Sequence, residues 1–234
     1  MNRPFKLVMA GMTLLLASVI SNVATAQNAG GIEEDDAREF ATKLGLIQGH
    51  LWVAAELVEI DLFELGSRHA KHPAEEVYQE LLPYFVAIKS PGFADDLEGM
   101  SALFGPNTIE AFRQSFARVM QKIDSTVTDL NLTDLDKLEV ARRLVLQASE
   151  EYGVGVNEGL ITDLQEYQDA RGFLYVAESF VDQTSVAQRD ELLGRIKAAS
   201  ALWPNLNPEA EIAVNSELLA ELNEGLEAAV SIKR

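Results

Sequence analysis

The chain contains no cysteine. Disulfide scaffolds, zinc–thiolate sites, iron–sulfur clusters, covalent c-type haem and cysteine nucleophiles are therefore excluded, because each needs a thiol. Positive charge is also scarce: 19 Lys and Arg stand against 37 Asp and Glu, which gives a formal net charge of -18. Nucleic-acid affinity comes largely from basic side chains that neutralise phosphates, so this balance argues against a nucleic-acid partner.

Apolar residues are plentiful by contrast, at 47% of the 234 residues. This fraction argues against disorder, and the length suits one domain or at most two small ones with a real core. The hydrophobic residues are spread along the chain, and after residue 26 no stretch reaches the length of a membrane span.

The first 26 residues have the pattern of an export signal. Arg3 and Lys6 precede an apolar stretch from Leu7 to Ile20, and the small residues Ala24–Ala26 provide a signal-peptidase site. A membrane anchor is the alternative, but the apolar core is short for a span. We expect residues 1–26 to be a cleaved signal, residues 27–36 a flexible acidic leader, and the product to be periplasmic and not membrane-spanning after cleavage.

Residues 37–234 carry apolar side chains every three or four positions, which is typical of amphipathic helices. No stretch shows convincing strand alternation. We expect an all-α domain, an antiparallel bundle of six to eight helices with short connections, which could divide into two subdomains meeting near 129–133. Gly66 is expected to end the first long helix and Pro73 to begin the next, and Thr133 with Asp136 resembles a capping box.

The chain has three histidines, and all of them fall between residues 50 and 72. Imidazole and carboxylate together, without thiol, form the ligand set that suits iron, copper, zinc or manganese. His50, His69 and His72 are therefore candidate metal ligands, with Glu56 as a nearby carboxylate. A helix that ends at Gly66 would place the turn about 24 Å from His50 along the helix axis, so the next helix must fold well back.

Each histidine also has an interpretation without metal. His72 precedes Pro73 in a pattern that caps a helix start, and His50 lies at the edge of the apolar stripe, where a half-buried core residue would fit. The spacing matches no strong zinc motif, because His-Glu-x-x-His is absent. The confinement of all three rings to one short segment is the observation that favours a metal site.

A second group of functional candidates lies between residues 150 and 173. On a helix Glu166 and Asp169 share one face, where paired carboxylates could bind a hard cation. The alternative is a solvated acidic face with Tyr167 and Phe173 in the core. Both carboxylates join the predicted metal ligands.

The segment from Gln147 to Val181 resembles the exported helical segment that precedes some bacterial high-affinity ferric permeases. The resemblance rests on a Glu-Tyr pair, a glycine turn ending at Glu158-Gly159, the apolar pair Leu160-Ile161, and Glu166-Tyr167 leading to Phe173. The membrane core and the Arg-Glu-x-x-Glu motif of that family are absent from this sequence. The resemblance therefore implies a soluble periplasmic module associated with the handling of metal, for which iron is one candidate, rather than a transporter.

Three hypotheses follow. The first is a periplasmic metal-binding protein for iron or copper, accessory to metal uptake or handling, whose partners are the metal ion and a membrane transporter or other envelope protein. The second is a helical interaction module that docks such a partner without metal. The third is an enzyme, the weakest because no nucleophile elbow, phosphate loop or dinucleotide fingerprint occurs. Non-covalent haem on a histidine stays open.

Overall fold

The computed structural model describes residues 32–73, 77–208 and 216–231. The expected signal and residues 27–31 of the expected leader lie outside these residues, whereas residues 34–36 of that leader already belong to the first helix. The prediction of an all-α fold is confirmed, with nine helices in the described residues instead of six to eight: α1 (Glu34–Glu59), α2 (Phe63–His72), α3 (Tyr78–Ala87), α4 (Ala94–Ser101), α5 (Ile109–Asp129), α6 (Asp134–Gly155), α7 (Leu164–Asp182), α8 (Arg189–Ser200) and α9 (Glu217–Ser231). Within the described ranges, no helix has the length and apolar character needed to span a bilayer.

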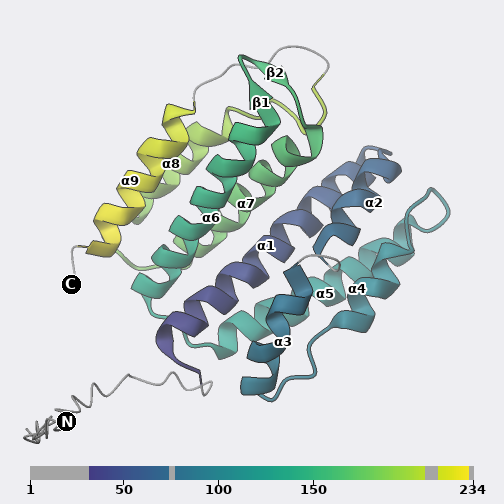
Figure 1. Cartoon of the computed structure of the whole chain (residues 1–234), viewed down its shortest axis with the longest axis horizontal. Helices are drawn as coiled ribbons and strands as arrows, with labels where there is room; N and C mark the ends of the chain where they lie inside the picture. The colour runs from purple at the N-terminus through teal and green to yellow at the C-terminus, as the bar shows by residue number, and fades with distance from the viewer. Residues whose placement is uncertain (1–31, 74–76, 209–215, 232–234) are drawn as a thin grey trace, which may run out of the picture.

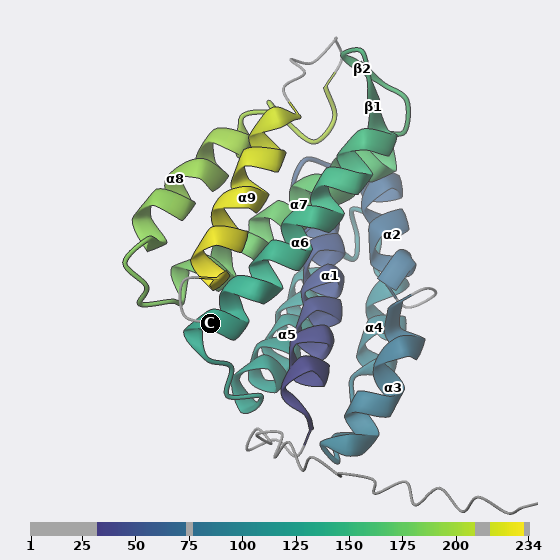
Figure 2. The same ribbon diagram turned by 60° about the vertical axis from the view of Figure 1, so that its left-hand side comes forward.

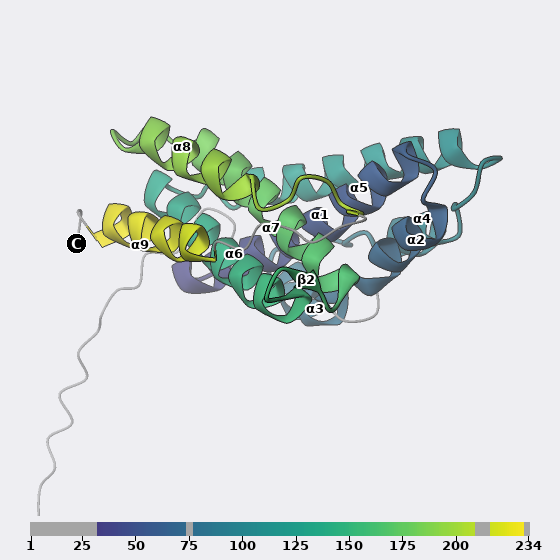
Figure 3. The same cartoon turned by 90° about the horizontal axis from the view of Figure 1, so that it is seen from above.

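The helices form two groups that meet along α1 and α7. Figure 1 shows α1 to α5 on one side and α6 to α9 on the other. Seen from above, α1 and α7 lie in the middle, between α8 and α9 on one side and α2 and α4 on the other (Figure 3). Both central helices carry long series of buried residues, so the contact between α1 and α7 belongs to the core.

A small hairpin joins α6 to α7. Strand β1 (Val156–Asn157) pairs antiparallel with β2 (Leu160–Ile161), and Val156 lies opposite Ile161. The two turn residues, Glu158 and Gly159, have φ angles of 52° and 84°. Positive φ at both central residues is the requirement of the tight turn that suits a two-residue hairpin. The sequence predicted a break here but no strands, since two-residue strands leave no alternation to detect.

Helix α1 ends earlier than the sequence predicted. Asp61 adopts a φ of 62°, its N–H donates to Val58 O at 3.1 Å, and the N–H of Leu62 donates to Leu57 O at 2.9 Å. These two bonds form a Schellman motif, which glycine usually closes and which aspartate closes here. The chain therefore reverses directly after Glu59, and the expected end at Gly66 is wrong.

Gly66 instead lies inside α2, where its missing side chain allows close packing. A Cβ at this position would lie 2.9 Å from Ala54 O and 3.2 Å from Val58 Cγ2, both on α1. Figure 2 shows α2 lying alongside α1. Pro73, expected to begin a helix, follows the last residue of α2. Both differences have one cause: the reversal near Asp61 lets α2 begin at Phe63.

The start of α6 agrees with the sequence. The predicted capping box is confirmed: Thr133 Oγ1 accepts from the N–H of Asp136 at 3.2 Å, and Asp136 Oδ2 accepts from the N–H of Thr133 at 2.9 Å. Asp136 also accepts from Arg38 Nη1 on α1 at 2.9 Å. The cap thus helps to fix α6 against α1.

Two glycines face each other where α1 crosses α7. A Cβ on Gly172 would lie 2.5 Å from Gly49 O, and a Cβ on Gly49 would lie 2.6 Å from Phe173 Cδ1 and 3.0 Å from the carbonyl carbon of Gly172. Any side chain at either position would push the two backbones apart. His50 follows Gly49 directly, so this close crossing sets how near His50 comes to α7.

Candidate metal centre

The centre of the site is a contact between α1 and α7. His50 Nδ1 lies 2.6 Å from Asp169 Oδ1, and both side chains are buried. The ring of Phe173, one helical turn beyond Asp169, packs edge-on against the His50 ring at a centroid distance of 5.0 Å. Packing and hydrogen bonding together fix the orientation of the His50 imidazole.

Helix α2 brings the other two histidines, His69 and His72, beside His50 and Asp169. His50 lies nine residues before the end of α1 at Glu59, and His72 lies nine residues after the start of α2 at Phe63. At 1.5 Å per residue, the chain travels about 14 Å out and about 14 Å back. The early reversal therefore shortens the span that the sequence suggested and returns His72 to His50, with their ring centroids 4.8 Å apart.

Asp169 connects all three imidazoles. Its Oδ1 also lies 2.8 Å from His69 Nδ1, and its Oδ2 lies 3.7 Å from His72 Nδ1. Burial alone would raise the pKa of Asp169, but the adjacent His50 and the hydrogen bonds with His50 and His69 hold that pKa well below its ordinary value of 3.8. Asp169 is therefore a carboxylate in the folded protein.

The second oxygen of the Asp169 carboxylate lacks a hydrogen bond. Asp169 Oδ2 is buried and has no hydrogen-bond partner. A buried carboxylate oxygen without a partner is costly in free energy, and such atoms in native structures call for an explanation. A cation beside Oδ2 would supply the missing interaction.

His69 differs from the other two histidines because both of its ring nitrogens face oxygen. Nδ1 faces Asp169 Oδ1, and Nε2 lies 2.7 Å from Gln168 Oε1. The Gln168 amide is oriented by its own Nε2, which donates to Leu206 O at 2.7 Å. Both His69 nitrogens are therefore engaged by oxygen atoms of α7 side chains, and neither is free to bind a metal.

His50, His72 and Asp169 form the group that can ligate. One donor atom from each lies within 4.8 Å of the other two. A metal about 2.1 Å from each donor holds neighbouring donors roughly 3 to 3.5 Å apart, so small side-chain adjustments would close this group around an ion. The His72 side chain is 20% exposed and lies 3.1 Å from Gln165 Nε2, which leaves the site open to solvent on this side.

Of the six predicted ligands, the structure brings together His50, His69, His72 and Asp169. Glu56 lies elsewhere: it is exposed and lines a separate cavity with Trp52 and Arg171. Glu166 shares α7 with Asp169, but its carboxyl hydrogen-bonds that of Glu151 instead of joining the group that can ligate.

Two supporting residues escaped sequence reasoning. Gln165 contacts His72, and Gln168 orients His69. Both lie on α7 within one turn of Asp169, and glutamine carries no charge to attract attention. The available signal was their spacing: residues 165, 168, 169 and 172 face the same side of a helix.

Glu166 provides a test of the electrostatics around the site. Burial, the hydrogen bond with Glu151 and the negative charges of Glu151, Asp169 and Asp163 raise its pKa to about 7. The folded protein then holds a proton that the unfolded chain releases near pH 4.5, so unfolding free energy should fall as the pH rises from about 4.5 past 7. Glu166→Gln removes the cost of ionising a buried carboxyl above pH 7. We therefore expect this variant to melt at the same temperature as the wild type near pH 5 and at a higher temperature at pH 8.

The matched control is Glu150→Gln, because Glu150 is exposed on the neighbouring helix. Thermal unfolding of the three proteins at pH 5 and pH 8 provides the comparison. Equal melting temperatures of the wild type and Glu166→Gln at pH 8 would contradict the raised pKa.

The fold and the site define an all-α bundle with a histidine–carboxylate cluster between its two halves. Residues 133–233 match the family model of the iron permease-associated 4-helix bundle domain. This segment contains α6, α7, α8 and α9, and it confirms and extends the resemblance predicted from residues 147–181. No curated protein and no solved structure matches the chain. Asp169 lies inside the matched segment, whereas all three histidines lie before it.

Proposed function

We propose that a transition-metal ion, with iron as the first candidate and copper as the second, binds between His50, His72 and Asp169. The observation that carries this proposal is the convergence of two imidazoles and one carboxylate, from three helices, on a carboxylate oxygen that has no hydrogen-bond partner. His69 acts as a positioning residue, since it contacts Asp169 through Nδ1 while its Nε2 is engaged by Gln168.

The ligand set supports iron. Two histidines and one carboxylate with open positions form the arrangement typical of non-haem Fe(II), and imidazole also suits copper. The net charge of -18 would concentrate cations near the protein. The match of residues 133–233 to an iron permease-associated domain supports the same choice independently of the histidines, which lie outside that segment.

We place this protein in the periplasm, on the basis of the export pattern in residues 1–26. There it would bind the metal reversibly and hand it to a membrane transporter, acting as an accessory to iron uptake. The open side of the site at His72 would allow the ion to enter and leave.

Isothermal titration of the mature protein with Fe(II), without oxygen, and with Cu(II) tests the proposal. We expect one ion per chain at pH 7.5, and no saturable heat in the double variant His50→Ala with His72→Ala. His69→Gln should keep the stoichiometry and lose about 10- to 100-fold in affinity, as expected for a residue that supports a ligand without binding the ion. Binding should weaken as the solution is acidified, because protonated imidazole cannot ligate.

Asp190→Asn is the control, since Asp190 is 91% exposed and far from the cluster in sequence. Unchanged heats in the His50 and His72 double variant would show that the ion binds elsewhere on the acidic surface. Absence of heat from either metal in the wild type would exclude the metal site and leave the helical interaction module.

A further inference from the structure

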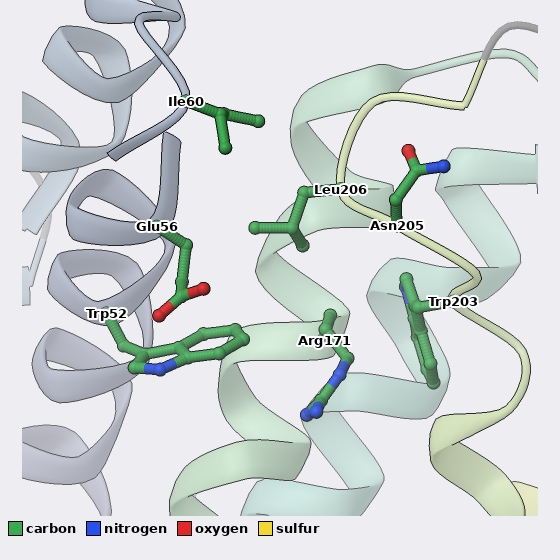
Figure 4. A pocket seen from close by; sticks show the side chains of 7 residues that line it. All are labelled: Trp52, Glu56, Ile60, Arg171, Trp203, Asn205 and Leu206. Atoms are coloured by element: carbon green, nitrogen blue, oxygen red, sulfur yellow. The ribbon is translucent and has the colours of Figure 1, made fainter. Parts of the chain in front are cut away.

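A cavity of about 320 Å³ lies between α1, α7 and the segment 203–206 that follows α8 (Figure 4). Arg171 reaches it from α7. Residues 169 and 171 are about 200° apart around a helix, so Arg171 faces away from the metal-site side of α7. The cavity is therefore a separate site from the candidate metal centre.

Arg171 brings a half-buried positive charge to the cavity. Its Nη1 is buried without a hydrogen-bond partner, and the carboxylates of Glu178 and Glu56 act on the guanidinium electrostatically without a hydrogen bond. The guanidinium stacks over the Trp52 ring at 5.1 Å, which compensates part of its desolvation. A buried donor in this position is built for an acceptor that the chain does not provide.

Two tryptophans form rigid apolar surfaces beside this charge. Trp52 stacks on Tyr175 at a centroid distance of 4.4 Å, and Trp203 Nε1 donates to Tyr167 O at 2.6 Å. Each ring is therefore fixed before any ligand arrives, which reduces the entropy that binding would cost. These are the only two tryptophans in the sequence.

A negative charge lies across the cavity from Arg171. Glu56 projects from α1 towards the same space (Figure 4), and it is close enough to act on Arg171 electrostatically without forming an ion pair. A simple anion would be attracted by Arg171 and repelled by Glu56. A molecule that carries both charges would satisfy both groups at once.

We propose that this cavity binds a zwitterionic small molecule, a free α-amino acid with an apolar or aromatic side chain. Its carboxylate would accept hydrogen bonds from Arg171, its ammonium group would contact Glu56, and its side chain would pack against Trp52 and Trp203. The cavity volume is at the lower end of the range found for small-molecule sites, which suits a ligand of this size.

Tryptophan fluorescence of the mature protein without metal provides the test, because both tryptophans line the cavity. The probes are L-phenylalanine, 3-phenylpropionate, which lacks the ammonium group, and phenethylamine, which lacks the carboxylate. We expect a saturable change with L-phenylalanine, and at least 10-fold weaker binding of the other two. Arg171→Met and Glu56→Gln should each weaken L-phenylalanine binding at least 10-fold.

The control variants are Arg113→Met and Glu59→Gln, which break an exposed ion pair whose atoms lie 2.7 Å apart, near the end of α1. They should leave the titration unchanged. Equal or tighter binding of 3-phenylpropionate, or tighter binding in Glu56→Gln, would overturn the zwitterion assignment in favour of an anion site. Absence of a saturable change with any probe would overturn the site altogether.

Discussion

Asp169→Asn should abolish metal binding and also destabilise the metal-free protein by about 3–5 kcal/mol, the usual cost of removing one partner from a buried charged pair. The variant keeps the shape of the side chain but removes the charge that holds His69 and His50. Urea unfolding of the metal-free protein measures the loss of stability, and titration with Fe(II) measures the loss of binding.

The same variant has a pH signature. Because folding lowers the pKa of Asp169, its contribution to stability is present above the ordinary pKa of 3.8 and is lost as the pH falls towards the folded value. The stability difference between the wild type and Asp169→Asn should therefore be full near pH 6 and shrink below pH 4. Asp190→Asn is the control, with an expected change within about 0.5 kcal/mol. A metal-free Asp169→Asn protein as stable as the wild type at pH 6 would contradict the role given to this carboxylate.

Gly172→Ala should cost about 1–3 kcal/mol and weaken metal binding, although residue 172 is not a ligand. The added Cβ would lie 2.5 Å from Gly49 O and 2.9 Å from Val53 Cγ2, so α1 and α7 must separate. That separation would lengthen the contact of 2.6 Å between His50 and Asp169. Urea unfolding and Fe(II) titration report the two effects separately.

Gly194→Ala is the matched control, because a Cβ at that helical position would meet nothing within 4 Å. It should stabilise the protein by up to about 1 kcal/mol, since alanine favours a helix over glycine, and should leave metal binding unchanged. If Gly172→Ala bound Fe(II) as tightly as the wild type, the close helix crossing would not set the geometry of the site.

The helical fold followed from periodicity, because each helix buries one face and repeats its apolar residues accordingly. The capping box at Thr133 and Asp136 could also be predicted from the sequence, since it depends on two residues that are three positions apart. The end of α1 could not be predicted in this way. Asp61 occupies the left-handed position after the helix, where glycine is the usual residue and the usual sequence signal. Gly66 misled the prediction, since its role is the close approach of α2 to α1 and is visible only in three dimensions.

The candidate site was predictable in its residue types and not in its assembly. Three histidines in one short segment drew attention to His50, His69 and His72, and the face shared by Glu166 and Asp169 drew attention to α7. Which carboxylate points at the histidines depends on the rotation of α7 against α1, and no local pattern encodes that rotation. Glu166 is one turn away on the same helix and contacts Glu151 instead.

The candidate site combines residues from inside and outside the segment that matches the family model. Asp169 belongs to the matched four helices, whereas His50 belongs to α1 and His72 to α2, which precede them. The cluster therefore exists only when the two groups of helices pack together. A change that loosens the contact between α1 and α7 should affect metal binding before it affects the four-helix unit itself.

X-ray absorption at the iron edge, on mature protein loaded with one equivalent of Fe(II), tests the central claim most directly. Binding by His50, His72 and Asp169 predicts a nitrogen and oxygen shell near 2.1 Å with outer-shell scattering from two imidazole rings, and loss of that scattering in the His50→Ala, His72→Ala double variant. A shell of oxygen alone, unchanged in the double variant, would place the iron on surface carboxylates and contradict the site.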